Sequence, residues 1–515
     1  MPTLPRSRRL RRYAPVAALT SCVLLTTAAC GGAADKPAAG TDKLALAVLG
    51  APNSFEVTQL SDGQPAYIWN SVYDTLLYTD NKGQLQPNAA ESWGYTDGGR
   101  TLTLKLRTGM KFSNGHGVNA AGVKASLDYV RTTPGSQQNS LDAIDAIEAP
   151  DDTTVVLKLK HPDASLLPSL SMGAGAIADP ETMKDPSAAL NPIGSGPYIL
   201  DKAATVNGSS YLLKKRDDYW NAAAYPFETV EVKVMGDRTA AVNALQDGQL
   251  NAGTVESTQV DQVKGAGFDV TVVPATSVGT LVLADRDGSV VKPLSDVRVR
   301  QAINMAFDRQ KMVSQFLRGV GRPTAQIVNP KSAEYDPALD TAYPFDPAAA
   351  KKLLADAGYA DGFSVTMPSL YYTKPFEPTI GQALKDIGIE VTWEPVPAQN
   401  NSIALTSGKY GMYFTADGLN AVPNDAKKYF SPQGIRNPFH TQNPEISGLL
   451  LEASGEQDPA KATDAFKKIN TYGTQNAWYA PVFYIGSSWV TKKGITYLGD
   501  GSSTLTTIRA FGTAS

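Results

Sequence analysis

Cysteine and histidine are scarce in this chain of 515 residues. There are two cysteines, Cys22 and Cys30, and three histidines, His116, His161 and His440. Neither cysteine lies beyond position 30, so the body of the protein cannot contain an internal disulfide or a cysteine-ligated metal. No two histidines have the spacing of zinc ligands. We therefore predict no metal site and no cofactor.

Catalytic motifs are missing as well. The sequence contains no G-x-S-x-G nucleophile elbow and no phosphate-binding glycine loop that ends in Lys-Ser or Lys-Thr. One match remains: Ser289 and Lys292 have the spacing used by serine acyl-transferases and peptidases that act on cell-wall peptides, but the partner Ser-Asp-Asn and Lys-Thr-Gly elements are absent. We therefore predict a binding protein and keep the serine enzyme as an alternative.

Long apolar runs are absent after position 30, so the sequence predicts no membrane-spanning helix in the body. Before it, five arginines precede an apolar run over residues 14–29, and small residues lead directly to Cys30. This layout is typical of a lipoprotein signal. We predict a signal peptide over residues 1–29, lipid such as palmitate on Cys30, and a flexible tether over residues 30–42.

Alternatives stay open for this N-terminal segment. The first is an ordinary secretory signal that is cleaved near Ala29, or a transmembrane anchor, which the short apolar run disfavours. The second concerns the route, because the pair Arg8-Arg9 also permits export through the twin-arginine pathway, in which the chain crosses the membrane already folded.

Strong charge of either sign is also absent. The formal net charge is −3, and it becomes more negative when the five arginines of the signal are removed. A mildly acidic, mixed surface argues against nucleic acid as a partner and against membrane adhesion beyond the lipid.

Strand and helix signals alternate through the rest of the chain, which indicates an α/β protein. Apolar or alternating runs predict strands at residues 43–49, 101–107, 153–159, 229–234, 363–367 and 389–396. Capping residues and helical spacing predict helices that begin after Asn119, Asp237, Asp346 and Asp458, a long helix over residues 296–317, and a helix over residues 378–387.

Several stretches, in this order along the chain, match those of one known family. They are residues 72–76, 85–93, 104–115, 194–198, 218–220, 245–248, 296–308, 345–358 and 387–389. With them the chain resembles the extracellular solute-binding proteins of ABC importers, specifically family 5, which binds peptides, dipeptides and nickel chelates. The match spans nearly the whole mature chain.

This resemblance implies a two-lobed periplasmic-binding-protein-like fold of class II, with an extra inserted subdomain. Carried onto this sequence, the first lobe comprises residues 43–67, 192–281 and 490–515. The inserted subdomain comprises residues 68–191, and the second lobe residues 282–489. A ligand would be enclosed between the lobes as they close.

The resemblance also indicates where a ligand would bind. Peptide-binding relatives carry a turn after a strand in which an aspartate pairs with the α-ammonium of the peptide. Here residues 409–414 resemble the strand and residues 416–420 the turn. An ungapped alignment puts Asn420 in the place of the aspartate, whereas matching Phe414 to the family's tryptophan puts Asp417 there. The two registers stay open.

Further ligand-binding candidates follow from the same resemblance. Gly63 and Gln64 lie in a segment that resembles the place where relatives pair with the ligand backbone, and Trp393 offers an aromatic wall. We thus expect a monomeric receptor, anchored by lipid to the outer (extracellular or periplasmic) face of the cell membrane. It would deliver a small solute to the permease and ATPase subunits of an ABC importer. A short peptide or peptide-like molecule is the expected solute, and a metal chelate or other non-peptide solute is the alternative.

Overall fold

The computed structural model describes residues 42–397, 400–504 and 506–513, all within the unit Thr41–Ser515. The predicted signal peptide, Cys30 and nearly all of the tether lie outside the described residues and stay predictions. Within the described ranges, no helix has the length and apolar character needed to cross a membrane.

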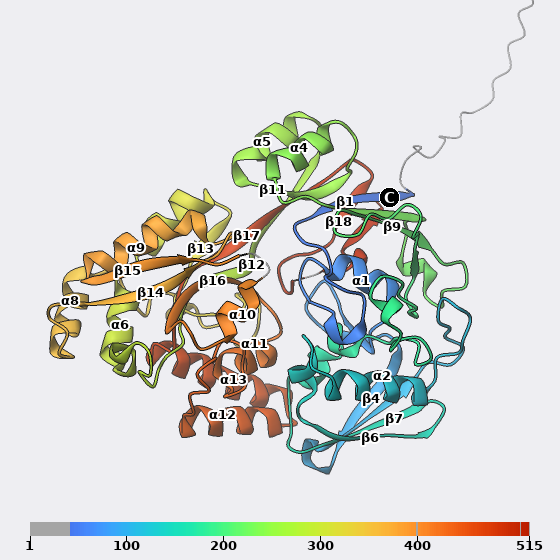
Figure 1. The fold of residues 1–515 in the computed structure, drawn as a ribbon, viewed down its shortest axis with the longest axis horizontal. Helices are drawn as coiled ribbons and strands as arrows, with labels where there is room; N and C mark the ends of the chain where they lie inside the picture. The colour runs from blue at the N-terminus through green and yellow to red at the C-terminus, as the bar shows by residue number, and fades with distance from the viewer. Residues whose placement is uncertain (1–41, 398–399, 505, 514–515) are drawn as a thin grey trace, which may run out of the picture. The chain divides into compact units, whose positions relative to one another are not determined.

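A nine-stranded sheet organises the fold (Figure 1). Its strands follow the order β16-β12-β17-β11-β1-β10-β9-β8, and β13 pairs with β17. The bounds are β1 Lys43–Val48, β8 Tyr198–Leu200, β9 Ser210–Lys215, β10 Thr229–Val234, β11 Ala252–Val255, β12 Asp269–Leu283, β13 Gly321–Pro323, β16 Met412–Gly418 and β17 Tyr479–Thr491.

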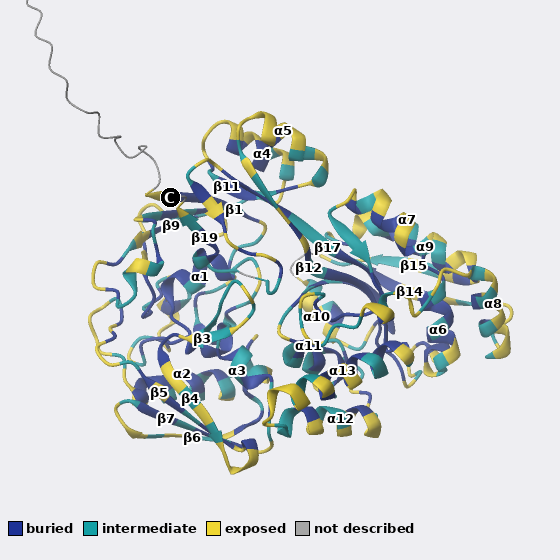
Figure 2. Cartoon of the chain, turned by 180° about the vertical axis from the view of Figure 1, so that it is seen from behind, coloured by how far each residue is buried: buried dark blue, intermediate teal, exposed yellow. Residues whose placement is uncertain are grey.

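Separate buried cores at the two ends of this sheet define two lobes. The first lobe is built around a core that includes Leu46, Trp69 and Leu104. The second is built around two neighbouring clusters that include Ile303 and Phe466. Figure 2 shows the same division, with buried strands inside each lobe and exposed residues on the outer faces of the helices. The mixed α/β, two-lobed fold class predicted from the sequence is confirmed, and the exact boundaries of the lobes stay a prediction.

β12 and β17 run through both lobes as an antiparallel pair (Figure 1). At one end β17 also pairs with β11 of the first lobe, and at the other β12 pairs with β16 of the second. The ladder is irregular in between: Val273 pairs with Ser487 but Ser277 with Ile485, so β12 carries extra residues there.

The first lobe contains a second, four-stranded antiparallel sheet, with order β4-β5-β7-β6. Its elements and their neighbours are α1 Ala66–Val72, β2 Leu77–Thr79, β3 Leu85–Pro87, β4 Ala90–Thr96, β5 Thr101–Leu106, α2 Ala120–Thr132, β6 Ile144–Asp151, β7 Thr154–Leu159 and α3 Leu166–Ser169. The first lobe also holds α4 Arg238–Gln246, α5 Val260–Gly265, β18 Ile495–Tyr497 and β19 Phe511–Thr513.

The second lobe is mainly helical around its share of the large sheet and the parallel pair β14-β15. Its elements are α6 Val297–Met305, α7 Arg309–Met312, α8 Pro347–Asp356, β14 Phe363–Ser369, α9 Glu377–Asp386, β15 Ile389–Pro395, α10 Asn401–Thr406, α11 Val422–Phe430, α12 Pro444–Gly455 and α13 Pro459–Gln475.

Most of the elements predicted from local signals are confirmed. The Asn119 side chain accepts from the Gly122 amide at the start of α2, and Asp237 and Asp458 cap α4 and α13 in the same way. The prediction of one long helix over residues 296–317 is wrong. It breaks after α6, because Asp308 caps a new start at α7, and a π-helical turn follows over Val313–Leu317.

The predicted turn over residues 416–420 begins too early. β16 extends to Gly418, because residues 412–418 pair with β12 as a complete ladder. Asp417 is therefore a strand residue, whereas Asn420 lies in the connection that leads to α11.

Candidate functional site

A cavity of about 120 Å³ is lined by residues of both lobes. The first lobe contributes α1 and residues near β2, β3 and α3, and the second contributes the connection between β16 and α11. A further side is lined by residues of the C-terminal segment, namely Ser502, Ser503, Thr504, Thr506, Thr507 and Arg509. At about 10–15 Å³ for each water on this measure, the cavity takes on the order of ten waters or a small solute of similar size.

One wall is a face of α1. Ala66, Trp69, Asn70 and Tyr73 are three or four residues apart, so they share that face and line the cavity. The Trp69 indole donates to the Ser61 carbonyl at 2.8 Å, which fixes the ring. The Asn70 side chain makes no hydrogen bond within the described part of the chain, so its amide is available to a solute.

Asp74 is a buried carboxylate that lines the cavity just after α1. The Tyr219 hydroxyl donates to it at 2.7 Å and the Trp220 indole at 3.4 Å. Burial raises the pKa of Asp74 to about 6, although these hydrogen bonds and the charge of Arg509 oppose the rise. At neutral pH the group is therefore mostly ionised, close to its titration range.

Asp62 lines the cavity beyond the N-terminus of α1. Its oxygens accept from the Gln137 amide at 2.9 Å and from the Gly173 backbone at 3.0 Å. Burial raises the pKa of Asp62, while these two hydrogen bonds lower it in part. Both partners are neutral, so in the described structure no cation pairs with this carboxylate.

Arg509 lines the cavity from the C-terminal segment. Its Nε donates to the Tyr225 hydroxyl at 2.7 Å and its Nη2 to Asn88 Oδ1 at 3.0 Å. The guanidinium carbon lies 4.2 Å from the centre of the Tyr78 ring, a cation–π contact. Neutral groups therefore hold the guanidinium in place.

Asp417 and Asn420, the two alternatives for the ligand-anchoring position, have different surroundings. Asp417 accepts from Arg436 Nε at 2.8 Å and Nη2 at 2.5 Å, and from the Tyr429 hydroxyl at 2.6 Å. Burial would raise the pKa of Asp417, but the Arg436 charge outweighs it and holds that pKa well below the ordinary value. Asp417 is thus engaged inside the second lobe, and it is not among the residues that line the cavity.

Asn420, in contrast, lines the cavity. Its backbone N–H and its side-chain amide both donate to the buried carboxylate of Asp425, each at 3.0 Å. Lys428 pairs with the same carboxylate at 2.7 Å. The connection after β16 therefore presents the neutral amide of Asn420 to the cavity. Asp425 holds this amide in place, and its own charge is paired with that of Lys428.

The remaining predicted site residues lie outside this cavity. Gly63 is exposed with φ +81°, and Gln64 accepts from the Leu49 amide at 3.3 Å. Phe414 is buried in the core of the second lobe, where its ring centre lies 5.5 Å from that of Phe376, and Trp393 packs against the same core. The cavity brings together only Asn420 from the predicted set. Its aromatic lining comes instead from Trp69, Tyr73, Tyr78 and Tyr225.

Sequence reasoning missed Asp74 and Arg509 as site residues. Asp74 stood within the stretch 72–76 that carried the family resemblance, so a signal existed. Arg509 had none, because its partner Asn88 lies 421 residues away in sequence.

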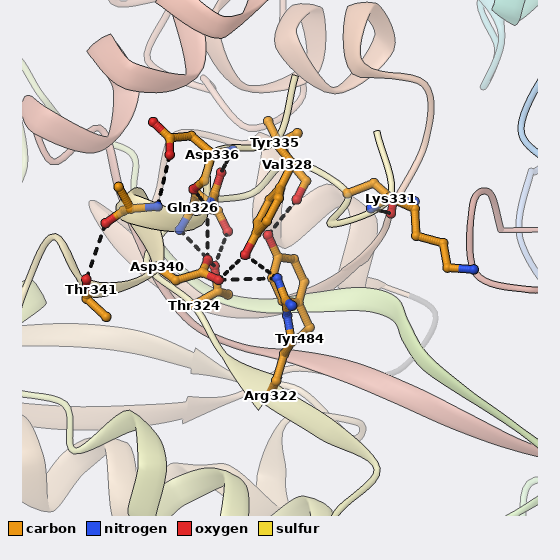
Figure 3. Close-up of polar contacts among 12 residues, drawn as sticks. Arg322, Thr324, Gln326, Val328, Lys331, Tyr335, Asp336, Asp340, Thr341 and Tyr484 are labelled. Atoms are coloured by element: carbon orange, nitrogen blue, oxygen red, sulfur yellow. Dashed lines mark hydrogen bonds and ion pairs between the residues drawn. The ribbon is translucent and has the colours of Figure 1, made fainter. Parts of the chain in front are cut away.

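A second polar cluster, in the second lobe, is centred on the carboxylate of Asp340 (Figure 3). Asp340 accepts from Thr324 at 2.8 Å, from Gln326 at 2.9 Å and from Arg322 at 3.2 Å, and Tyr335 also donates to it. Lys331 points away from the group. With its acceptors filled by protein donors, this cluster braces the segment between β13 and α8.

Ser289 lies between β12 and the 3₁₀ turn that begins at Lys292. The Ser289 backbone donates to Asp285 at 2.8 Å, and no hydrogen bond joins the Ser289 hydroxyl to the Lys292 ammonium among the described residues. A nucleophile activated by a neighbouring base requires that contact. Over the described ranges there is likewise no cluster of three or more His, Cys, Asp or Glu suited to a metal ion.

Polar contacts also join the lobes directly, between α11 and the region of α3. Lys427 pairs with Asp142 at 2.7 Å and with Asp163 at 2.9 Å. The Asn424 amide donates to the Ser169 hydroxyl at 3.0 Å. Burial would lower the pKa of Lys427, but the two carboxylates raise it above its ordinary value. The ammonium is therefore stabilised by charge across the interface.

Two α/β lobes joined by a crossing strand pair, with a cavity lined from both sides, define the class of periplasmic binding proteins. The profile described as bacterial extracellular solute-binding proteins, family 5 Middle, matches residues 84–440, and the chain belongs to this family of ABC-importer binding proteins.

Individual relatives agree with this assignment. The chain is 26% identical over 437 residues to the glutathione-binding protein GsiB of Shigella dysenteriae, covering 80% of this chain and 83% of that protein. The fold matches the binding protein AgaA of A. tumefaciens R10 in complex with agropinic acid, with a TM-score of 0.80, 23% identity and coverage of 92% and 99%. It also matches DppA of Helicobacter pylori in complex with the peptide STSA, with a TM-score of 0.79, 22% identity and coverage of 92% and 98%.

Proposed function

We propose that this protein is the lipid-anchored receptor of an ABC importer, and that it captures a small peptide or peptide-like solute in the cavity between its lobes. The observation that supports this most directly is the lining of that cavity by α1 of the first lobe and the β16–α11 connection of the second. A solute that contacts both walls favours the closed arrangement by its differential affinity.

Within this site, we assign the contact from the second lobe to Asn420. Asp417 is already paired with Arg436, so a ligand ammonium would have to displace a buried guanidinium to reach it. A neutral amide anchors an ammonium less strongly than a carboxylate does. This favours, as a second candidate, a solute whose recognition does not depend on a free α-ammonium at this position, such as the acid to which AgaA binds.

Binding measurements test the proposal. Calorimetry and thermal shift against short peptides, glutathione, opines and metal chelates should identify a solute that raises the unfolding temperature in a saturable way. Asn420→Ala should weaken that solute by about 1–2 kcal/mol because a polar contact to the cavity is lost. Absence of binding across all four classes would contradict the proposed solute class.

The anchor is tested separately. We propose that Cys30 carries the lipid and that the mature chain is a monomer on the outer face of the cell membrane. Metabolic labelling with a palmitate analogue should mark the wild-type protein and not Cys30→Ser, which should be released from the membrane fraction. Labelling of Cys30→Ser to the wild-type level would refute the anchor and leave solute binding unaffected.

A further inference from the structure

Arg509 is half-buried, and its guanidinium keeps one nitrogen free of protein acceptors in the described part of the chain. Arg300 and Arg309 also lack a carboxylate partner, but each uses all three guanidinium nitrogens on oxygen acceptors of the surrounding protein. Arg509 uses only Nε and Nη2, and Nη1 has no acceptor within the described residues.

The residue that carries this free donor lines two hollows of the protein. Arg509 lines the interlobe cavity, and together with Tyr78 it also lines a neighbouring surface depression. No carboxylate oxygen of the described chain lies within ion-pair distance, 4 Å, of its guanidinium. Asp74 is close enough to influence it electrostatically, but its oxygens are occupied by Tyr219 and Trp220.

The guanidinium is also held rigidly. The Tyr225 hydroxyl and the Asn88 amide oxygen fix two of its nitrogens, and the Tyr78 ring covers one face at 4.2 Å. Little side-chain entropy remains to be lost when a ligand binds, which makes a pre-positioned arginine a favourable anion site.

We propose that Arg509 anchors a carboxylate of the solute through Nη1, so that the site selects small solutes with a free acid group. This rests on the proposed solute-binding function. A single negative charge fits better than a doubly charged phosphate, because Asp74 and Asp62 line the same cavity and repel additional negative charge. Asp62, which has only neutral partners, suits a positively charged group elsewhere on the same solute.

The first test uses the wild-type protein alone. Calorimetry is performed with alanyl-alanine, glutathione and mannopinic acid, and with the carboxamide of each compound. The acid form of the solute that binds should bind at least tenfold more tightly than its amide, because a charge-assisted hydrogen bond to a carboxylate is replaced by a weaker one to a neutral amide oxygen. Equal affinity of an acid and its amide would overturn the inference and leave solute binding intact.

The second test compares matched arginine variants. Arg509→Gln should remove the preference for acid over amide, whereas Arg509→Lys should retain part of it. Arg107→Gln is the control. Arg107 Nε donates to the backbone carbonyl of the same Asn88 at 2.7 Å, and its guanidinium stacks over Trp220, but Arg107 does not line the cavity. It should keep the full preference.

The outcomes separate the two proposals. If Arg509→Gln folds and keeps the wild-type ratio of acid to amide affinity, the assignment to Arg509 is refuted. If it fails to fold, the acid-to-amide ratio of the wild-type protein still decides whether the site selects a carboxylate. Failure of every acid and amide to bind would count against the proposed solute class and would refute this inference with it.

Discussion

Replacing Lys427 by methionine should weaken solute binding although Lys427 does not line the cavity. The ammonium pairs across the lobes with Asp142 at 2.7 Å and with Asp163 at 2.9 Å, and the Asp163 side chain is only 7% exposed. In an open arrangement all three groups would be solvated, so their mutual attraction contributes only to the closed form.

The magnitude follows from burial. The pair with Asp142, whose side chain is 36% exposed, contributes less than about 1 kcal/mol. The energy of the pair with Asp163 lies between those of exposed and buried ion pairs, since Ser165 also donates to this carboxylate and would still do so without Lys427. We expect Lys427→Met to cost the closed form about 2 kcal/mol in total. At 1.4 kcal/mol for each factor of ten, this weakens the apparent affinity about thirtyfold.

Calorimetry with the cognate solute measures this effect. The matched control is Lys468→Met, which removes an ion pair with Glu452 at 3.0 Å that is exposed and lies entirely within the second lobe. Its affinity should be that of the wild-type protein. Adding Asp163→Asn to Lys427→Met should recover part of the loss, because no buried carboxylate is then left unpaired. A folded Lys427→Met variant with wild-type affinity would refute the reasoning.

Three further predictions concern stability. Asp417→Asn should lower the free energy of unfolding by about 3–5 kcal/mol, because it leaves Arg436 buried without its counter-charge; an unchanged urea midpoint would contradict this. Because the pKa of Asp74 is raised to about 6, the protonated carboxyl should stabilise the fold fully below pH 4, and this stabilisation should be lost as the pH rises through 6. In urea titrations the free energy of unfolding of Asp74→Asn should therefore rise by about 3 kcal/mol relative to that of the wild-type protein between pH 4 and pH 7. A difference that stays constant over this range would contradict the prediction. Gly196→Ala should cost about 3 kcal/mol, since its Cβ would lie 2.5 Å from the Val72 carbonyl carbon, and a wild-type melting temperature would refute that reading.

Sequence alone predicted the parts of this fold that depend on local chemistry. Helices capped by Asn119 and Asp237 begin where the capping side chains indicate, because a cap involves only the next few residues. The break after α6 was missed although Asp308 is itself a capping residue. The helical spacing of apolar residues continues past Asp308, so the pattern gives no sign that a second helix begins there.

The site was less predictable because it is assembled from distant segments. Asn420 was one of two alternatives, and the choice between them depended on the length of β16, which is set by pairing with β12 rather than by its own sequence. Arg509 and Tyr225 meet over a separation of 284 residues, and no local pattern marks either as a cavity residue.

The irregular stretch of the β12–β17 ladder has a mechanical consequence. Because the two strands stay bonded on both sides of it, relative rotation of the lobes twists a two-stranded ribbon instead of separating it. The extra residues near Pro274 give that ribbon a place to absorb torsion without breaking flanking hydrogen bonds. Because Tyr225, Asn88 and Tyr78 hold Arg509 on the first lobe, we expect such a rotation to change the distance between Arg509 and the β16–α11 connection of the second lobe.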